Sequence, residues 1–166
     1  MSKTYEHLQE EFAGESQANR KYLAFAEKAD RDGYPQAARL FRAAAAAETV
    51  HAHAHLRAMK GIGSTEDNLK EAVAGEIHEF KSMYPEMIDD AKAEGETVAE
   101  RSFKFALEVE GIHAGLYQKM LDELEAEGKK DYPYYICPVC GYTAEEEAPE
   151  TCPVCGAKGK MFERVD

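Results

Sequence analysis

Two stretches of sequence decide the fold of this chain: Glu48-Thr49-Val50-His51 and Glu110-Gly111-Ile112-His113. Each is a Glu-x-x-His motif, and residues three apart on a helix project in similar directions, so both side chains can reach one point. An earlier glutamate stands before each motif: Glu15 lies 33 residues before the first and Glu76 lies 34 before the second. The spacing predicts two related helix pairs, each with a glutamate on its first helix and Glu-x-x-His on its second.

Helix-breaking residues divide the segment from residue 4 to 128 into four predicted helices. Glycine favours the left-handed conformation that ends a helix, and proline fits the first helical turn. We expect helices over about 4–32, 35–60, 65–94 and 96–127, ended by Gly33, Gly61, Gly95 and Gly128, with Ser64 or Thr65 as a cap and Pro85 as a kink in the third. This pattern is typical of a four-helix bundle.

The inward seams of these helices contain acids and imidazoles besides apolar residues, but no Lys or Arg. Burying ionised carboxylates without a partner costs several kcal/mol each, so a bundle core that holds them needs another source of positive charge. Metal ions are the available compensation, and a Glu from each of two helices plus Glu-x-x-His from the other two is a known di-metal arrangement. Oxygen-rich ligation suits iron or manganese better than zinc.

The predicted metal ligands share these inward positions and are Glu15, Glu48, His51, Glu76, Glu79, Glu110 and His113. Glu48 and Glu110 are placed to bridge two metals. Tyr22 and Tyr84 could each bring a hydroxyl near a ligand carboxylate, and the alternative is a buried tyrosine that finds an ordinary hydrogen-bond acceptor. We expect His55 to be a core residue or a neighbour of the ligands.

All four cysteines of the chain lie in two matched Cys-x-x-Cys turns, called knuckles here: Cys137-Pro138-Val139-Cys140 and Cys152-Pro153-Val154-Cys155. Four thiolates make a tetrahedral site for iron or zinc. A segment of about 35 residues cannot be stabilised by core burial alone, so the metal must provide much of its folding energy. A structural zinc ribbon is the alternative, but a neighbouring redox site favours iron as an electron entry route. We therefore divide the chain into a bundle over 1–130 and a four-cysteine domain over 131–166.

The formal net charge of −12 excludes some classes of partner. Nucleic acid calls for a Lys/Arg excess, and anionic membranes are disfavoured for the same reason. The sequence has no run of about 18 apolar residues for a membrane span and no secretion signal. Clustered cysteines in metal-binding pairs fit a reducing compartment, so we expect a cytoplasmic protein.

Taken together, these motifs resemble rubrerythrin across essentially the whole chain: Gly14-Glu15-Ser16-Gln17, Glu48-Thr49-Val50-His51, Gly75-Glu76-Ile77-His78-Glu79, Met83-Tyr84-Pro85 and Glu110-Gly111-Ile112-His113, then the knuckles. The resemblance implies a mainly α protein, with a ferritin-like four-helix bundle followed by a small rubredoxin-like domain. It also implies three irons per chain, two in a di-iron site and one held by the four cysteines, with manganese or zinc substitution left open.

The resemblance further implies a division of the ligands. Glu15, Glu48, Glu79 and Glu110 would serve one iron, and Glu48, Glu76, Glu110 and His113 would serve the other. On reduction, His51 would replace Glu79.

The implied activity is that of a non-haem di-iron peroxidase, which reduces hydrogen peroxide to water and protects against oxidative stress. The chain has no glycine-rich dinucleotide fingerprint, so electrons would come from NAD(P)H through a separate reductase or a rubredoxin. A head-to-tail homodimer or larger oligomer is implied, with the small domain of one chain beside the di-iron site of its partner. Two alternatives stay open: a ferritin-like iron oxidase that uses O2, and a metal-storage bundle tethered to a zinc ribbon.

Overall fold

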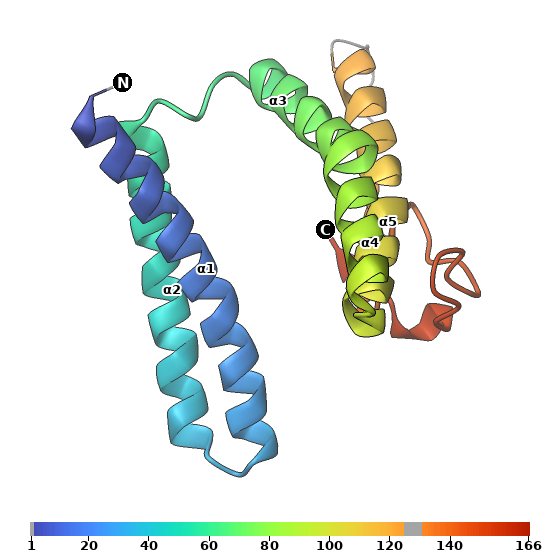
Figure 1. The fold of residues 1–166 in the computed structure, drawn as a ribbon, viewed down its shortest axis with the longest axis horizontal. Coiled ribbons are helices and arrows are strands. Elements are labelled where there is room, and N and C mark those ends of the chain that lie inside the picture. Colours follow the sequence, from blue (N-terminus) through green and yellow to red (C-terminus); the bar gives the residue numbers. More distant parts are fainter. Residues whose placement is uncertain (1, 125–130) are drawn as a thin grey trace. The chain divides into compact units, whose positions relative to one another are not determined.

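The computed structural model describes residues 2–124 and 131–166, which fall into two compact units, Met1–Gly63 and Ser64–Asp166. The first unit contains α1 (Lys3–Arg31) and α2 (Pro35–Ala58). The second contains α3 (Thr65–His78), η1 (Glu79–Met83), α4 (Tyr84–Glu94), α5 (Thr97–Asp122), β1 (Tyr134–Ile136), β2 (Thr143–Glu145), η2 (Gly159–Met161) and β3 (Glu163–Val165). Figure 1 shows each helix pair as an antiparallel hairpin.

The first unit is a hairpin with an alanine seam. Gly33 adopts a φ of 82° between the two helices, and Pro35 opens α2 at its first turn, as predicted. Ala26, Ala29 and Ala38 are buried at the seam, with Phe41 packed against them. Small side chains let the two helices approach closely, but they bury little apolar area, so this hairpin needs a further partner to cover it.

The third predicted helix is interrupted in a way that the sequence did not reveal. Ser64 caps α3 through a capping box with Asp67, and Gly95 ends α4 at a φ of 75°. We predicted a kink at Pro85, but the structure has a π-helical turn instead, in which the Tyr84 N–H donates to the Glu79 carbonyl. Pro85 has no N–H to donate, and a π turn is one way for a helix to absorb that loss.

Two predicted helix ends differ from the structure. The second helix stops at Ala58 rather than Lys60, and α5 stops at Asp122 rather than 127. Gly128, the predicted end of the fourth helix, lies outside the described residues.

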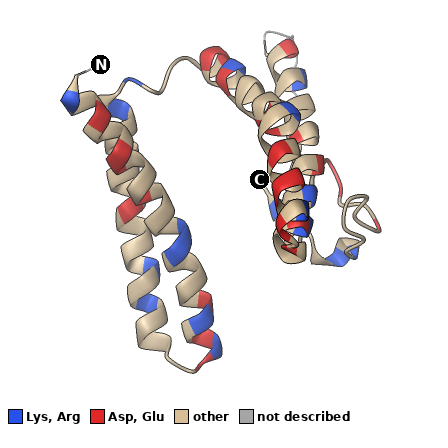
Figure 2. Cartoon of the chain, viewed as in Figure 1, with Lys and Arg blue, Asp and Glu red and all other residues tan. Residues whose placement is uncertain are grey.

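Charged residues of both signs are spread over both units (Figure 2). In the part of the chain that the structure describes, no helix is long and apolar enough to cross a membrane.

The four-cysteine domain is built on a three-stranded antiparallel sheet in the order β2-β1-β3. Each knuckle is closed by backbone hydrogen bonds, and Gly141 and Gly156 follow the knuckles with φ values of 85° and 78°. That left-handed conformation favours glycine. Cys137 and Cys152 are buried, at 1% and 2% exposure.

Candidate metal centres

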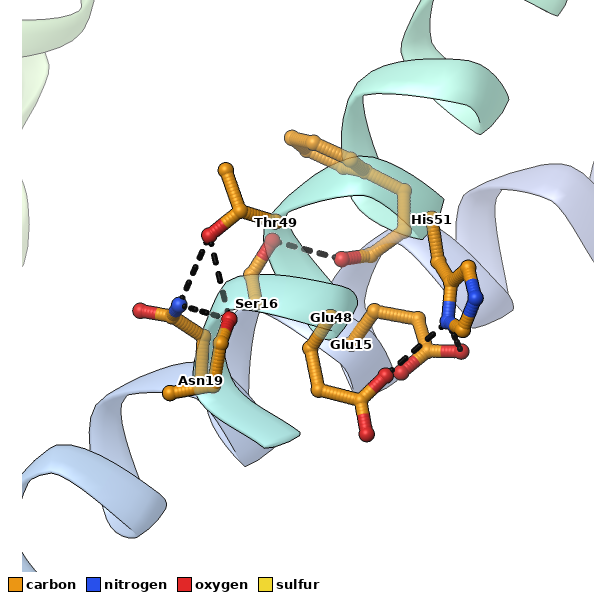
Figure 3. A network of polar contacts seen from close by, with 8 residues as sticks. Glu15, Ser16, Asn19, Glu48, Thr49 and His51 are labelled. Atoms are coloured by element: carbon orange, nitrogen blue, oxygen red, sulfur yellow. Dashed lines mark hydrogen bonds and ion pairs between the residues drawn. The ribbon is translucent and has the colours of Figure 1, made fainter. Parts of the chain in front are cut away.

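The first half-site consists of Glu15 on α1 and Glu48 and His51 on α2 (Figure 3). Nδ1 of His51 lies 3.0 Å from Glu48 Oε2 and 3.5 Å from Glu15 Oε1. The carboxylates are mostly covered, with 22% and 18% of their side chains exposed, whereas 55% of the His51 side chain is exposed. One ligand atom from each residue lies within 4.8 Å of the others, so one cation could contact all three.

A network of hydrogen bonds joins α1 to α2 one helical turn after Glu15. The Asn19 side-chain amide donates to the Ala45 carbonyl at 2.7 Å and to Thr49 Oγ1 at 2.8 Å. Thr49 Oγ1 in turn donates to the Ala45 carbonyl at 3.2 Å. Figure 3 shows Asn19 and Thr49 next to the ligand pair. Neither residue was predicted to have a role at the site, although Asn19 stands four residues after Glu15, a spacing that places both side chains on one face of a helix.

The first half-site is electrostatically strained without a cation. A hydrogen bond shared with Glu48, with burial and charge repulsion, raises the pKa of Glu15, while the same hydrogen bond and His51 lower the pKa of Glu48. Two carboxylates this close share one proton, because both cannot ionise side by side. A bound metal cation would replace that proton.

The second half-site repeats the arrangement with Glu76 on α3 and Glu110 and His113 on α5. Nδ1 of His113 lies 2.9 Å from Glu110 Oε2 and 3.9 Å from Glu76 Oε1. Burial, a hydrogen bond shared with Glu110 and the nearby charges raise the pKa of Glu76 to about 7. The internal repeat predicted from the motif spacing is therefore present as two matched three-residue clusters.

Tyr84 lies near this second cluster. Burial, followed by the charges of Glu110, Glu79 and Glu76, raises the pKa of the Tyr84 hydroxyl. Glu79, which begins the π-helical turn, contributes charge but is not one of the three clustered ligands. Tyr22 lies in an aromatic group, with its ring centroid 6.4 Å from Phe25 and 6.2 Å from Phe41.

A third group of possible ligands involves Glu11, Glu15 and His55. Its ligand atoms also lie within 4.8 Å of one another. We expected His55 to be a core residue or a neighbour of the ligands, and it lies beside Glu15. Glu11 was not predicted, although it stands one helical turn before Glu15, the spacing that places two side chains on one face.

The four cysteines form a cluster of their own, in which the sulfurs all lie within 4.8 Å of one another. The Cys137 and Cys155 sulfurs lie 3.6 Å apart, as do those of Cys140 and Cys152. Burial raises the pKa of Cys140. For Cys152, the effect of burial is outweighed by hydrogen bonds from the backbone of Cys155 and Val154, and its pKa is lowered to about 7. Backbone N–H groups aimed at a sulfur stabilise the thiolate form, which is the form that binds metal.

The four-cysteine domain docks on α5 of its own chain. His113 Nε2 lies 2.9 Å from Thr143 Oγ1 on β2, and the Lys119 ammonium contacts Glu145 at 2.8 Å. β2 therefore contacts a predicted ligand of its own chain. The expected placement of this domain beside the di-iron site of a partner chain stays a prediction. Thr143 was missed, because no local pattern links residues 30 positions apart in different domains.

The donor sets fit iron in both places. Carboxylates with one imidazole per half-site offer the hard and borderline donors that iron accepts, and four thiolates offer a tetrahedral soft site. In the described residues, the side-chain atoms of each cluster converge closely enough for a shared cation.

Comparison with known proteins finds two family models that match successive parts of the chain. The family model described as Rubrerythrin matches residues 6–121, and the model described as Rubrerythrin, rubredoxin-like domain matches residues 135–163. Rubrerythrin-2 of Clostridium acetobutylicum is 41% identical, over 96% of this chain and 95% of that protein. Nigerythrin of Nitratidesulfovibrio vulgaris is 37% identical, over 92% and 81%.

A solved structure of nigerythrin in its fully reduced, all-ferrous state is similar to this chain, with a TM-score of 0.60 and 34% sequence identity over 99% of this chain and 88% of that one. The predicted fold class is confirmed: ferritin-like helices are followed by a rubredoxin-like domain. The predicted cofactors, a di-iron site and a mononuclear four-cysteine iron, are confirmed as well.

Proposed function

Because this chain belongs to the rubrerythrin family, we propose that it is a non-haem di-iron peroxidase that reduces hydrogen peroxide to water. The observation that carries the proposal is the presence in one chain of two kinds of iron site. Carboxylate-rich clusters suit a site that delivers two electrons to a small oxidant, and a four-thiolate site suits one-electron supply. A storage protein would have little use for the second site.

The side chains around the clusters have definable tasks in such a reaction. When bound, the two irons supply the electrons for O–O cleavage and act as Lewis acids toward the departing oxygens. The four half-site carboxylates neutralise the metal charge. A tyrosine hydroxyl is protonated at neutral pH, and burial together with the charges of Glu110, Glu79 and Glu76 raises the pKa of Tyr84 further, so this hydroxyl is available as a hydrogen-bond donor near the second half-site.

The electrons must come from outside the chain. We propose a rubredoxin or an NAD(P)H-dependent reductase as the donor, because the sequence has no nucleotide-binding fingerprint. Four thiol groups committed to a metal require a reducing compartment, and this supports the cytoplasm as the location.

The length of one connection supports a homodimer in which the di-iron site is shared. A ferritin-like bundle joins its two hairpins by one long crossover, since the second and third helices run in the same direction. Glu48 lies ten residues before the end of α2, and Glu76 lies eleven residues after the start of α3. Glu48 and Glu76 would have to lie at the same level of the bundle to serve one site. At about 1.5 Å of rise per residue, the crossover from the end of α2 to the start of α3 would then have to travel about 31 Å along the bundle.

The available connection is too short for that path. Only residues 59–64 join α2 to α3. The seven Cα–Cα steps from Ala58 to Thr65 reach about 25 Å at full extension. We therefore propose that each di-iron site combines the first half-site of one copy with the second half-site of another. Such an exchange would also cover the apolar side chains that the first unit leaves exposed, such as Leu40 and Val50.

Anaerobic stopped-flow mixing tests the activity. The iron-loaded protein is fully reduced and mixed with stoichiometric H2O2 or O2, while the ferric–thiolate absorbance and the electrons consumed are followed. We expect fast oxidation by peroxide and much slower oxidation by O2. A preference for O2 would favour the iron-oxidase alternative, and stoichiometric zinc in the four-cysteine site would favour the storage protein.

A further inference from the structure

The Thr143 hydroxyl lies between His113 and the turn that carries Cys140. Oγ1 of Thr143 donates to the Gly141 carbonyl at 3.2 Å and lies 2.9 Å from His113 Nε2. Gly141 directly follows Cys140. A carbonyl oxygen only accepts, so the Thr143 hydroxyl can donate its proton to Gly141 and present a lone pair to the imidazole. When a metal occupies Nδ1 of His113, Nε2 is the nitrogen that carries a proton, and it can donate to that lone pair.

This contact fixes the form in which His113 can bind a metal. In the neutral imidazole, a proton on Nε2 leaves the lone pair on Nδ1. Nδ1 is the atom that faces the second half-site, 2.9 Å from Glu110 and 3.9 Å from Glu76. A histidine that ligates a metal usually donates its other ring N–H to an oxygen, which sets the orientation of the ring.

The docking of the small domain holds the hydroxyl in place. Thr143 and Glu145 are alternate residues of β2 and so project from the same face of the strand. Glu145 accepts from Lys119 on α5 and from the Tyr132 hydroxyl, at 2.8 Å and 2.6 Å. On the other side of Thr143, a Cβ at Gly141 would lie 3.7 Å from Val109 Cγ1, so the glycine backbone rests on α5.

The matched histidine of the first half-site has no such support. His51 occupies the same motif position, but 55% of its side chain is exposed, against 27% for His113. Within residues 2–124 and 131–166, Nε2 of His51 makes no hydrogen bond. The sequence repeat therefore hides a structural asymmetry: among the described residues, the His113 imidazole has a hydrogen-bond partner at both ring nitrogens, whereas the His51 imidazole has one at Nδ1 alone.

We propose that Thr143 is a positioning residue that couples the four-cysteine iron to the di-iron site, by fixing the His113 tautomer and joining that imidazole to the Cys140 turn. The inference rests on the proposed function. With iron held by the four cysteines and by the half-site ligands, each transfer would move one electron from the four-cysteine site, oxidising its iron from ferrous to ferric, and would reduce one ferric ion of the pair. The hydroxyl proton stays on Thr143, and the external NAD(P)H-linked donor then reduces the four-cysteine iron again.

Two variants separate the hydroxyl from the shape of the side chain. Thr143→Val keeps the volume and removes the hydroxyl, whereas Thr143→Ser keeps the hydroxyl. The first measurement is NMR of the histidine ring nitrogens in the zinc-loaded full chain, which is diamagnetic and requires no turnover. The second is the rate at which the flash-reduced four-cysteine iron is re-oxidised by the ferric di-iron site in the iron-loaded protein.

In Thr143→Val, we expect the His113 Nε2–H signal to shift and to exchange faster with water, while the His51 signal stays unchanged. The internal transfer should slow by at least about 10-fold, the usual size of effect for a residue that supports a metal ligand. Thr143→Ser should match the wild-type protein in both the His113 Nε2–H signal and the rate of internal transfer. An unchanged His113 signal, an unchanged transfer rate, or equal loss in the serine variant would each overturn the proposal. If wild-type protein transfers the electron internally but does not react with peroxide, the proposed function fails and the coupling role stands.

Discussion

Glu76 and Glu110 share a hydrogen bond in the second half-site, and burial together with that contact raises the pKa of Glu76 to about 7. The folded metal-free protein therefore holds a proton on Glu76 that the unfolded chain releases near the ordinary value of 4.5. Between these two values the folded state binds more protons, so its stability falls as the pH rises from about 4.5 to 7. Added metal should reverse this trend, because a cation replaces the proton.

Urea unfolding of metal-free protein at pH 5 and pH 8 measures this effect. Glu76→Gln should reduce the difference between the two midpoints, because its side chain cannot ionise. If wild type and Glu76→Gln show the same pH dependence, Glu76 does not carry the raised pKa.

Asn19→Ala should loosen the α1–α2 hairpin. The substitution removes two hydrogen bonds, to the Ala45 carbonyl and to Thr49, which together are expected to contribute about 1–3 kcal/mol. The free energy of unfolding from urea titration measures the loss, and Gln17→Ala, an exposed position on the same helix, is the control. Equal stability of the two variants would mean that the network contributes nothing.

Gly159→Ala should destabilise the four-cysteine domain. A Cβ at this position would overlap the Pro149 carbonyl oxygen, so the backbone would have to move. Overpacking of this kind costs about 1–3 kcal/mol or more. Loss of the ferric–thiolate absorbance on heating reports the effect directly. Lys160→Ala, at a neighbouring exposed residue, should melt like wild type.

His51→Ala and Glu79→Ala should each slow peroxide turnover without unfolding the protein. The resemblance makes these two residues exchange partners on one iron, and the other ligands remain in each variant. We expect at least about a 10-fold loss in turnover, measured at steady state with the same electron donor. His53→Ala, on an exposed position of α2, is the control. Unchanged turnover in both ligand variants would remove the exchange from the mechanism.

Local patterns predicted much of the fold and most of the clustered ligands. Gly33, Gly95 and Ser64 act at helix ends as expected, because helix termination depends on nearby backbone chemistry. The spacing of Glu48 and His51 on one helix likewise predicted that their side chains would meet, since a helix fixes that geometry within one turn.

Features that depend on distant parts of the chain were not predicted. The contact of Thr143 with His113 arises from the docking of the small domain on α5, and no sequence period encodes it. The π-helical turn from Glu79 was likewise missed, because Pro85 permits either a kink or a change in the hydrogen-bond pattern. The proposed exchange of half-sites between copies rests on the length of the 59–64 connection, which is a constraint on distance rather than on pattern.

A mixing experiment tests the shared site. Glu48→Ala damages the first half-site and Glu110→Ala the second, so neither variant alone retains an intact site. If each site takes its halves from two copies, a mixed dimer has one site in which both halves are damaged and one in which both are intact. Random pairing of equal amounts makes about half of the dimers mixed, and therefore about a quarter of all sites intact. Co-refolding the two variants with different tags should restore about a quarter of wild-type turnover. The matched control pairs Glu48→Ala with Glu15→Ala, which damage the same half-site, so no pairing can restore a complete site. Should purified mixed dimers of Glu48→Ala and Glu110→Ala remain as inactive as the control, each chain must build the site from its own two units.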